Sequence, residues 1–151
     1  MQLRRMGEAA VGPLLQALST STEYGRGRAA RTLGEIGDPA ATPALVKALE
    51  DDKFDVRWLA ALAVVALGQP GLAALLQALI ERPDSNLLRE SAHHVLHDEA
   101  HEKWSRQLAP VMQALEGPDP DVALPMAATN ALKAIRSRPT RPTIRASGES
   151  R

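Results

Sequence analysis

The chain contains no cysteine, and its 151 residues include only one Phe, one Tyr and two Trp. Without cysteine, disulfides and thiolate metal sites are excluded, and nothing in the composition indicates an oxidising compartment. With so few aromatic rings, the core has to be aliphatic. No apolar run approaches the roughly 18 residues that a membrane-spanning helix needs, and no apolar signal-peptide segment follows the first residues. We therefore expect a cytoplasmic protein that does not contact a membrane.

Catalytic motifs are also missing from the sequence. There is no glycine-rich phosphate loop after a strand, no G-x-S-x-G turn and no cysteine nucleophile. We therefore expect neither an enzyme nor a bound cofactor.

Neither sign of charge is in excess, because 18 basic and 18 acidic residues balance. The charges are unevenly distributed, however. Residues 136–151 carry five arginines against one glutamate, which leaves 13 basic and 17 acidic residues in the first 135. This last stretch is poor in apolar residues and contains two prolines, so it cannot offset the entropy cost of ordering. The expected organisation is a folded repeat domain over residues 1–137 and a disordered basic tail over residues 138–151.

One phrase of eight residues recurs four times along the chain. Its final leucines are 31, 30 and 36 residues apart. Self-similarity at such a period is typical of a solenoid, in which each repeat is one supersecondary unit. The four copies are VGPLLQAL (11–18), TPALVKAL (42–49), LAALLQAL (72–79) and LAPVMQAL (108–115).

Between these phrases lie segments of a second type, whose apolar residues also follow helical spacing. A helix stop and start separates the two types: Gly37 suits the left-handed position after a helix, Asp38 can cap the next helix, and Pro39 fits its first turn. The sequence therefore predicts an all-α stack of about four helix pairs. The second-type segments are GRAARTLGEIG, VRWLAALAVVALG, LLRESAHHVLH and LPMAATNALKAI.

The beginning of the chain is predicted to lie inside a repeat. MGEAAVGPLLQAL aligns without gaps with LGQPGLAALLQAL, which would make residues 2–6 the end of a preceding helix. The end face of a repeat is apolar unless a polar cap covers it. An uncapped end would allow self-association with another copy or contact with a partner.

The stretch RAARTLGEIGDPAATPALVKALEDDKFDVRWLAALAVVALG resembles the HEAT repeat, in particular the short bacterial HEAT-like repeats of phycobilin lyase subunits. The resemblance extends over residues 7 to about 135. It implies a HEAT-like solenoid, that is, a right-handed α-α superhelix whose second helices line the concave side. It also implies a non-enzymatic scaffold that binds protein partners through that side.

If the recurring phrases are the second helices, they share one outward position. Its occupants are Gln16, Lys47, Gln77 and Gln113, which we call the polar ladder. In a solenoid such a ladder is a candidate surface for a protein partner, and the alternative is a set of merely solvated positions. The basic tail suggests nucleic-acid binding as a further alternative. The ladder does not favour it, because clustered arginine or lysine and aromatic platforms are absent there.

All four histidines lie between residues 93 and 101. On a helical wheel, Glu90, His93 and His97 lie opposite the apolar arc of their helix, so they face outward. Two imidazoles at i and i+4, with a carboxylate one turn earlier, could bind a divalent metal ion. The alternative is a polar helix face that uses histidine. The helix is expected to end near His97, which assigns His101 to a different element.

Overall fold

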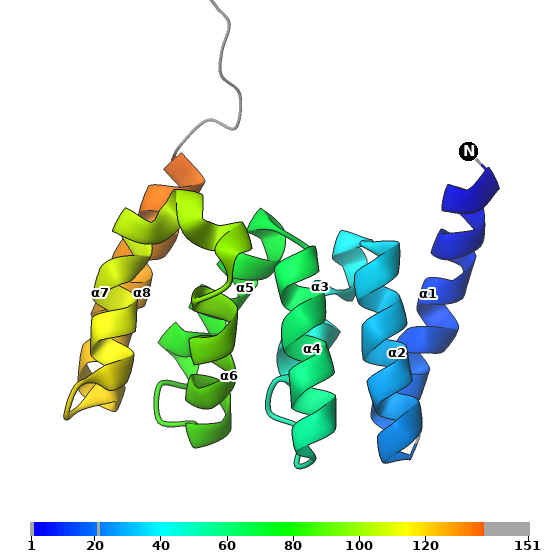
Figure 1. Ribbon diagram of the computed structural model, residues 1–151, viewed down its shortest axis with the longest axis horizontal. Coiled ribbons are helices and arrows are strands. Elements are labelled where there is room, and N and C mark those ends of the chain that lie inside the picture. The colour runs from blue at the N-terminus through cyan, green and yellow to red at the C-terminus, as the bar shows by residue number, and fades with distance from the viewer. Residues whose placement is uncertain (1, 21, 138–151) are drawn as a thin grey trace, which may run out of the picture.

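The computed structural model describes residues 2–20 and 22–137, and within them the chain is helical without strands (Figure 1). None of the described helices is long and apolar enough to cross a membrane. The all-α prediction is confirmed. The α-helices are α1 (Gln2–Thr20), α2 (Glu23–Ile36), α3 (Thr42–Ala48), α4 (Phe54–Ala66), α5 (Gln69–Glu81), α6 (Asn86–Leu96), α7 (Ser105–Glu116) and α8 (Pro120–Ser137), and the short 3-10 helices are η1 (Pro39–Ala41) and η2 (Glu99–Trp104).

Successive helices run in opposite directions and form two rows (Figure 1). The first row contains α1, α3 and α5, and the second row contains α2, α4 and α6. Each helix packs on its partner in the other row and on its neighbour in its own row. This arrangement confirms the predicted solenoid of four helix pairs.

The turn between the first two pairs follows the predicted stop and start. Gly37 has a φ of 75°, and its N–H donates to Leu33 O at 3.0 Å. The Asp38 carboxylate accepts from the Ala40 N–H at 2.9 Å, and Pro39 begins η1. Only glycine adopts the left-handed conformation without a steric penalty, so Gly37 fixes the end of α2.

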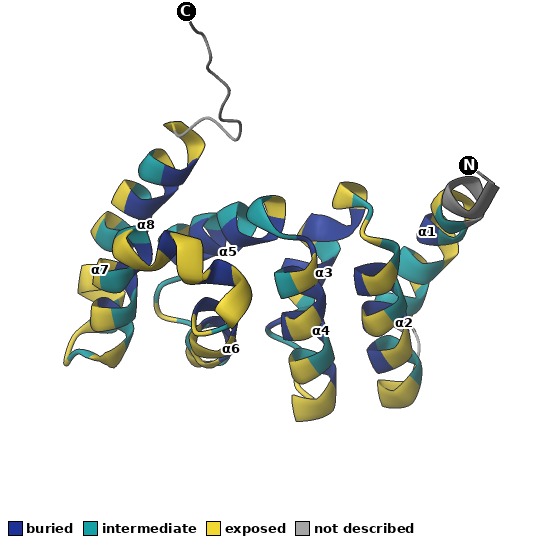
Figure 2. Ribbon diagram, turned by 45° about the horizontal axis from the view of Figure 1, so that its top comes forward, coloured by how far each residue is buried: buried dark blue, intermediate teal, exposed yellow. Residues whose placement is uncertain are grey.

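The core is aliphatic and lies between the rows, where Figure 2 shows the buried residues. Its largest fully buried side chains include Leu33, Leu45, Leu76 and Leu88. Such residues contact six to twelve others in a protein interior, so each helix is held from both rows.

Small residues let α2 and α4 approach closely within the second row. A Cβ atom added at Gly34 would lie 2.7 Å from the Cβ and 2.8 Å from the Cα of Ala63. In the first row, α1 and α3 touch at only a few residues. At this end of the array, the closer packing is therefore within the second row, between α2 and α4.

Loop 49–53 connects α3 to α4 and binds side chains from several repeats. The Asp51 carboxylate accepts two hydrogen bonds from the Arg26 guanidinium, at 2.8 Å and 3.0 Å. Arg57 donates to the Asp51 backbone carbonyl at 2.7 Å. Burial would raise the pKa of Asp51, but the hydrogen bonds from Arg26 and from the Lys53 N–H outweigh it and lower that pKa.

The neighbouring Glu50 binds side chains of the third pair, between α5 and α6. Its carboxylate accepts from Arg82 at 2.9 Å and from the Ser85 hydroxyl at 2.6 Å. Ser85 also caps α6 by accepting from the Leu88 N–H. Farther along α6, the buried Ser91 hydroxyl donates to the Leu49 carbonyl at 2.8 Å. These bonds fix α6 against the loop of the preceding repeat.

The last pair departs from the two-row pattern. Helix α7 lies beside α6, and α8 packs against α5, so the two helices of this pair have exchanged rows (Figure 1). At the far end of α8, the Gln69 side chain donates to Ile135 O at 3.4 Å. The prediction that all four phrases share one row is therefore wrong for residues 108–115.

The exchange coincides with η2, which is inserted between α6 and α7. Asp98 caps η2 by accepting from the Ala100 N–H at 2.9 Å. His101 and Trp104 are buried in η2 and attach it to the core. The chain therefore reaches α7 from a different direction than it reaches α3 or α5.

At the other end, residues 2–20 form one continuous helix that includes Pro13. The expectation that residues 2–6 are the end of a separate helix is wrong, because they continue into α1. At the C-terminal end, α8 ends at Ser137, and the predicted tail over 138–151 lies outside the described residues.

Candidate functional site

The polar ladder is only partly assembled. Gln16, Lys47 and Gln77 lie on α1, α3 and α5 of the first row, whereas Gln113 lies on α7 next to α6. Lys47 and Gln77 line one shallow groove between α3 and α5. The Gln77 amide donates to Glu81 at 3.0 Å. The ladder therefore has three members in one row.

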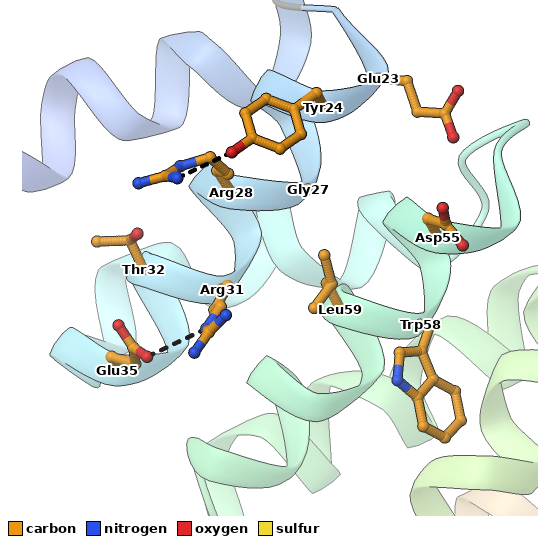
Figure 3. Close-up of a pocket in the computed structure, with 10 residues that line it drawn as sticks. All are labelled: Glu23, Tyr24, Gly27, Arg28, Arg31, Thr32, Glu35, Asp55, Trp58 and Leu59. Atoms are coloured by element: carbon orange, nitrogen blue, oxygen red, sulfur yellow. Dashed lines mark hydrogen bonds and ion pairs between the residues drawn. The ribbon is translucent and has the colours of Figure 1, made fainter.

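A larger groove lies on the opposite face, between α2 and α4 (Figure 3). Its volume is about 760 Å³, and Tyr24, Gly27, Trp58 and Leu59 form its apolar lining. A second hollow continues from it along the same two helices to Leu62. We call this surface the aromatic groove. Gly27 has no side chain, so Leu59 can lie close to α2 and form the floor.

Charged groups surround the apolar lining of the aromatic groove. Arg28 donates to the Tyr24 hydroxyl at 3.0 Å and lies over the same ring. Arg31 pairs with Glu35 at 3.3 Å. Glu23 and Asp55 lie in the first turns of α2 and α4, so one end of the groove is acidic.

The aromatic surface continues from α4 to α6. The Phe54 and Trp58 rings stack at a centroid distance of 6.3 Å, and the Trp58 and His94 rings meet edge-on at 5.2 Å. Arg57 lies over the Phe54 ring at 5.7 Å. Tyr24, Phe54 and Trp58 are exposed to 72%, 55% and 41%. The face thus presents three of the four aromatic side chains of the chain to solvent.

The histidines divide into an exposed group and a buried one. His93 and His94 of α6 and its C-cap residue His97 are exposed, and the helical wheel predicts this for His93 and His97. The predicted carboxylate partner, Glu90, is exposed as well but lies 3.7 Å from Arg57 of α4. The carboxylate near the imidazoles is instead that of Glu116 at the end of α7, 3.7 Å from His93 Nε2.

His101 is buried in η2. Its Nδ1 lies 2.9 Å from Val95 O, and its Nε2 is buried without a hydrogen-bond partner in the described part of the chain. The sequence predicts correctly that His101 belongs to a separate element. Its burial could not be predicted, because η2 has no helical periodicity from which a buried face can be identified.

Sequence reasoning missed the aromatic groove and Glu116. The groove had a signal, since Phe54 and Trp58 are four residues apart and share a helix face. Glu116 had none, because its proximity to His93 depends on the exchange of rows in the last pair.

The family model for HEAT repeats matches residues 11–97. No curated protein and no solved structure matches the chain. The matched region begins within α1 and ends at His97, immediately before the segment that leads to η2. Repeated helix pairs, their capping residues and this match together show that the chain belongs to the HEAT repeat family.

Proposed function

We propose that this protein is a non-enzymatic interaction module of the cytoplasm that binds a protein partner through the aromatic groove. HEAT repeats are commonly protein-interaction scaffolds. The observation that carries the proposal is the exposure of Tyr24, Phe54 and Trp58 on one face of a chain that has only four aromatic residues. Tyrosine and tryptophan are enriched where partners bind most strongly.

The lining of the groove indicates what the partner presents. An apolar side chain of the partner would lie over Leu59, between Tyr24 and Trp58 (Figure 3). A basic side chain would lie beside Glu23 and Asp55 at the acidic end. We therefore propose that the partner contributes a segment with an apolar residue next to a lysine or arginine.

The polar ladder is the competing surface for the same function. Its members Lys47 and Gln77 line a groove whose remaining charges are Glu50, Glu81 and Arg82. Arg82 already pairs with Glu50 at 2.9 Å, and Gln77 already donates to Glu81. These polar groups already bind one another, whereas Tyr24 and Trp58 are 72% and 41% exposed and present apolar surface to a partner.

The test places a photo-crosslinking amino acid at one position of each surface. Tyr24 represents the aromatic groove and Lys47 the polar ladder, and both side chains are exposed. After irradiation in a lysate of the source organism, we expect a discrete adduct from position 24 and none of the same mass from position 47. Trp58→Ala should reduce the position-24 adduct at least about tenfold, as expected for a central aromatic contact.

The matched control is a ladder variant with Gln16→Glu, Lys47→Glu, Gln77→Glu and Gln113→Glu, which should retain the position-24 adduct. Circular dichroism establishes that each variant is folded. A discrete adduct from position 47 that the ladder variant abolishes would instead assign partner binding to the ladder. An adduct at position 24 that Trp58→Ala leaves undiminished would contradict the proposed groove.

A further inference from the structure

The ends of α6 and α7 bring two imidazoles and one carboxylate together. His93 of α6 and the C-cap residue His97 are four residues apart, and their rings stack at a centroid distance of 4.1 Å. Glu116, the last residue of α7, approaches them from the neighbouring helix. One ligand atom of each residue lies within 4.8 Å of the other two.

The orientation of His97 favours a free ligand nitrogen. Its Nδ1 lies 2.8 Å from the His93 backbone carbonyl, so Nδ1 carries the proton that it donates there. The lone pair is then on Nε2, which is the nitrogen available to a metal ion. A backbone carbonyl that fixes the tautomer in this way is a typical outer-shell partner of a metal-binding histidine.

We propose that His93, His97 and Glu116 form a binding site for a divalent transition-metal ion such as Zn²⁺. Two imidazoles and a glutamate are a ligand set that zinc uses in proteins when its fourth position is occupied by water or another molecule. Calcium and magnesium are excluded as the preferred ions, because they require oxygen ligands.

To bind the ion, the side chains have to rotate so that ligand atoms now within 4.8 Å of one another move closer. Zinc–nitrogen bonds of roughly 2.0–2.1 Å at tetrahedral angles place ligand atoms about 3.3 Å apart. His93 Nε2 and a Glu116 carboxylate oxygen are already 3.7 Å apart. The side chains of His93 and Glu116 are 50% and 61% exposed, so they can rotate without disturbing the core.

The ion would link α6 to α7 across the irregular segment. These two helices lie side by side because the last pair has exchanged rows. The chain joins them through residues 97–104, which include η2. Metal binding to the folded state would therefore stabilise the departure from the regular array. This inference does not depend on the aromatic groove or on the proposed partner.

The experiment titrates metal-free protein, with any purification tag removed, with ZnCl2 in competition with a zinc indicator. We expect one ion per chain. His93→Ala and Glu116→Gln should each weaken the affinity at least about tenfold, as loss of a ligand does. His94→Ala is the matched control, because His94 is an exposed histidine of the same helix outside the ligand set, and it should leave the affinity unchanged.

Hydrogen exchange supplies a second measurement. Zinc should slow exchange in the last turn of α7 in the parent chain and not in Glu116→Gln. Binding that is equally tight in Glu116→Gln would overturn the proposal, since it would show that the ion is held within α6 alone. Loss of affinity in His94→Ala equal to that in His93→Ala, or no binding of Zn²⁺ by the folded parent chain, would overturn it as well.

Discussion

The first three helix pairs and the last pair contain the same kind of helix but assemble differently. In α7, Leu108, Val111 and Ala114 are buried along one face, and the residues at the same phrase positions in α5, Leu72, Leu75 and Ala78, are buried as well. The local pattern is therefore the same in both regions. What differs is the connection, which before α7 contains the six-residue η2.

This comparison separates two kinds of information in a repeat sequence. The apolar stripe determines which face of a helix is buried. The length and anchoring of the connection determine which neighbour covers that face. In the regular pairs the connection is a short turn such as that at Gly37, whereas η2 is attached to the core by His101 and Trp104.

The largest effect is expected for Trp104→Ala, which removes the main anchor of η2. Trp104 is 7% exposed, and truncation of a buried tryptophan costs about 3–5 kcal/mol of unfolding free energy. Urea unfolding measures this loss. Because η2 orients the last pair, hydrogen exchange should accelerate first in α7 and α8, while α2 and α4 keep their protection. A uniform loss of protection would contradict a separate role for this region.

A smaller effect is expected within the regular region for Gly34→Ala. The new Cβ would lie 2.8 Å from the Cα of Ala63, so the backbones of α2 and α4 would have to move apart. Overpacking of this kind costs about 1–3 kcal/mol. Thermal unfolding measures it.

Gly27→Ala in the same helix is the matched control. Its Cβ would meet only the Cδ1 atom of Leu59, at 2.9 Å, and that flexible side chain can rotate away. The gain in helix propensity, about 1 kcal/mol, should then offset most of the cost. Equal destabilisation by both substitutions would show that the missing Cβ atom at Gly34 is not what allows α2 and α4 to lie close together.

The sequence predicted the helices, their pairing and the capped turn at Gly37, Asp38 and Pro39, because these depend on residues close together in the chain. It also predicted that α6 ends near His97. It did not predict the exchange of rows, since the rows depend on which long-range contacts η2 permits. The insertion itself was visible as the longer interval before the fourth phrase.

The carboxylate that lies beside the imidazoles could not be predicted from the sequence for the same reason. His93 and His97 are correctly placed on the exposed face of α6, but Glu116 is brought to them by the new position of α7. The helical wheel identified Glu90 as the carboxylate near the imidazoles because a wheel compares residues of one helix only. The partner of Glu90, Arg57, belongs to the preceding pair and could be identified only from the structure.

Asp51→Asn tests the loop that connects the regular pairs. The substitution removes the charge that accepts two hydrogen bonds from Arg26, and we expect a loss of about 1–2 kcal/mol at pH 7, measured by urea unfolding. The pKa of Asp51 is lowered in the folded chain. Its contribution is therefore complete above the unfolded pKa of roughly 3.9 and disappears as pH falls through the folded value.

The difference between parent and Asp51→Asn should accordingly be constant near neutral pH and narrow below about pH 4. The last pair has no part in this carboxylate's contacts, so exchange in α7 should change less than exchange in α2. A difference that stays constant down to pH 2 would show that the Asp51 charge does not stabilise the loop.

The smallest effect is expected for Glu90→Gln, although Glu90 lies on the same helix as the two imidazoles. Its carboxylate is 61% exposed and lies 3.7 Å from Arg57, and exposed ion pairs of this kind contribute about 0–1 kcal/mol. Arg57 keeps its hydrogen bond to the Asp51 carbonyl without Glu90. Thermal unfolding should therefore change by no more than about 2–4 °C. A larger loss would mean that α6 is attached to the regular region mainly through this pair, and that Ser91 and loop 49–53 contribute less than their buried hydrogen bonds indicate.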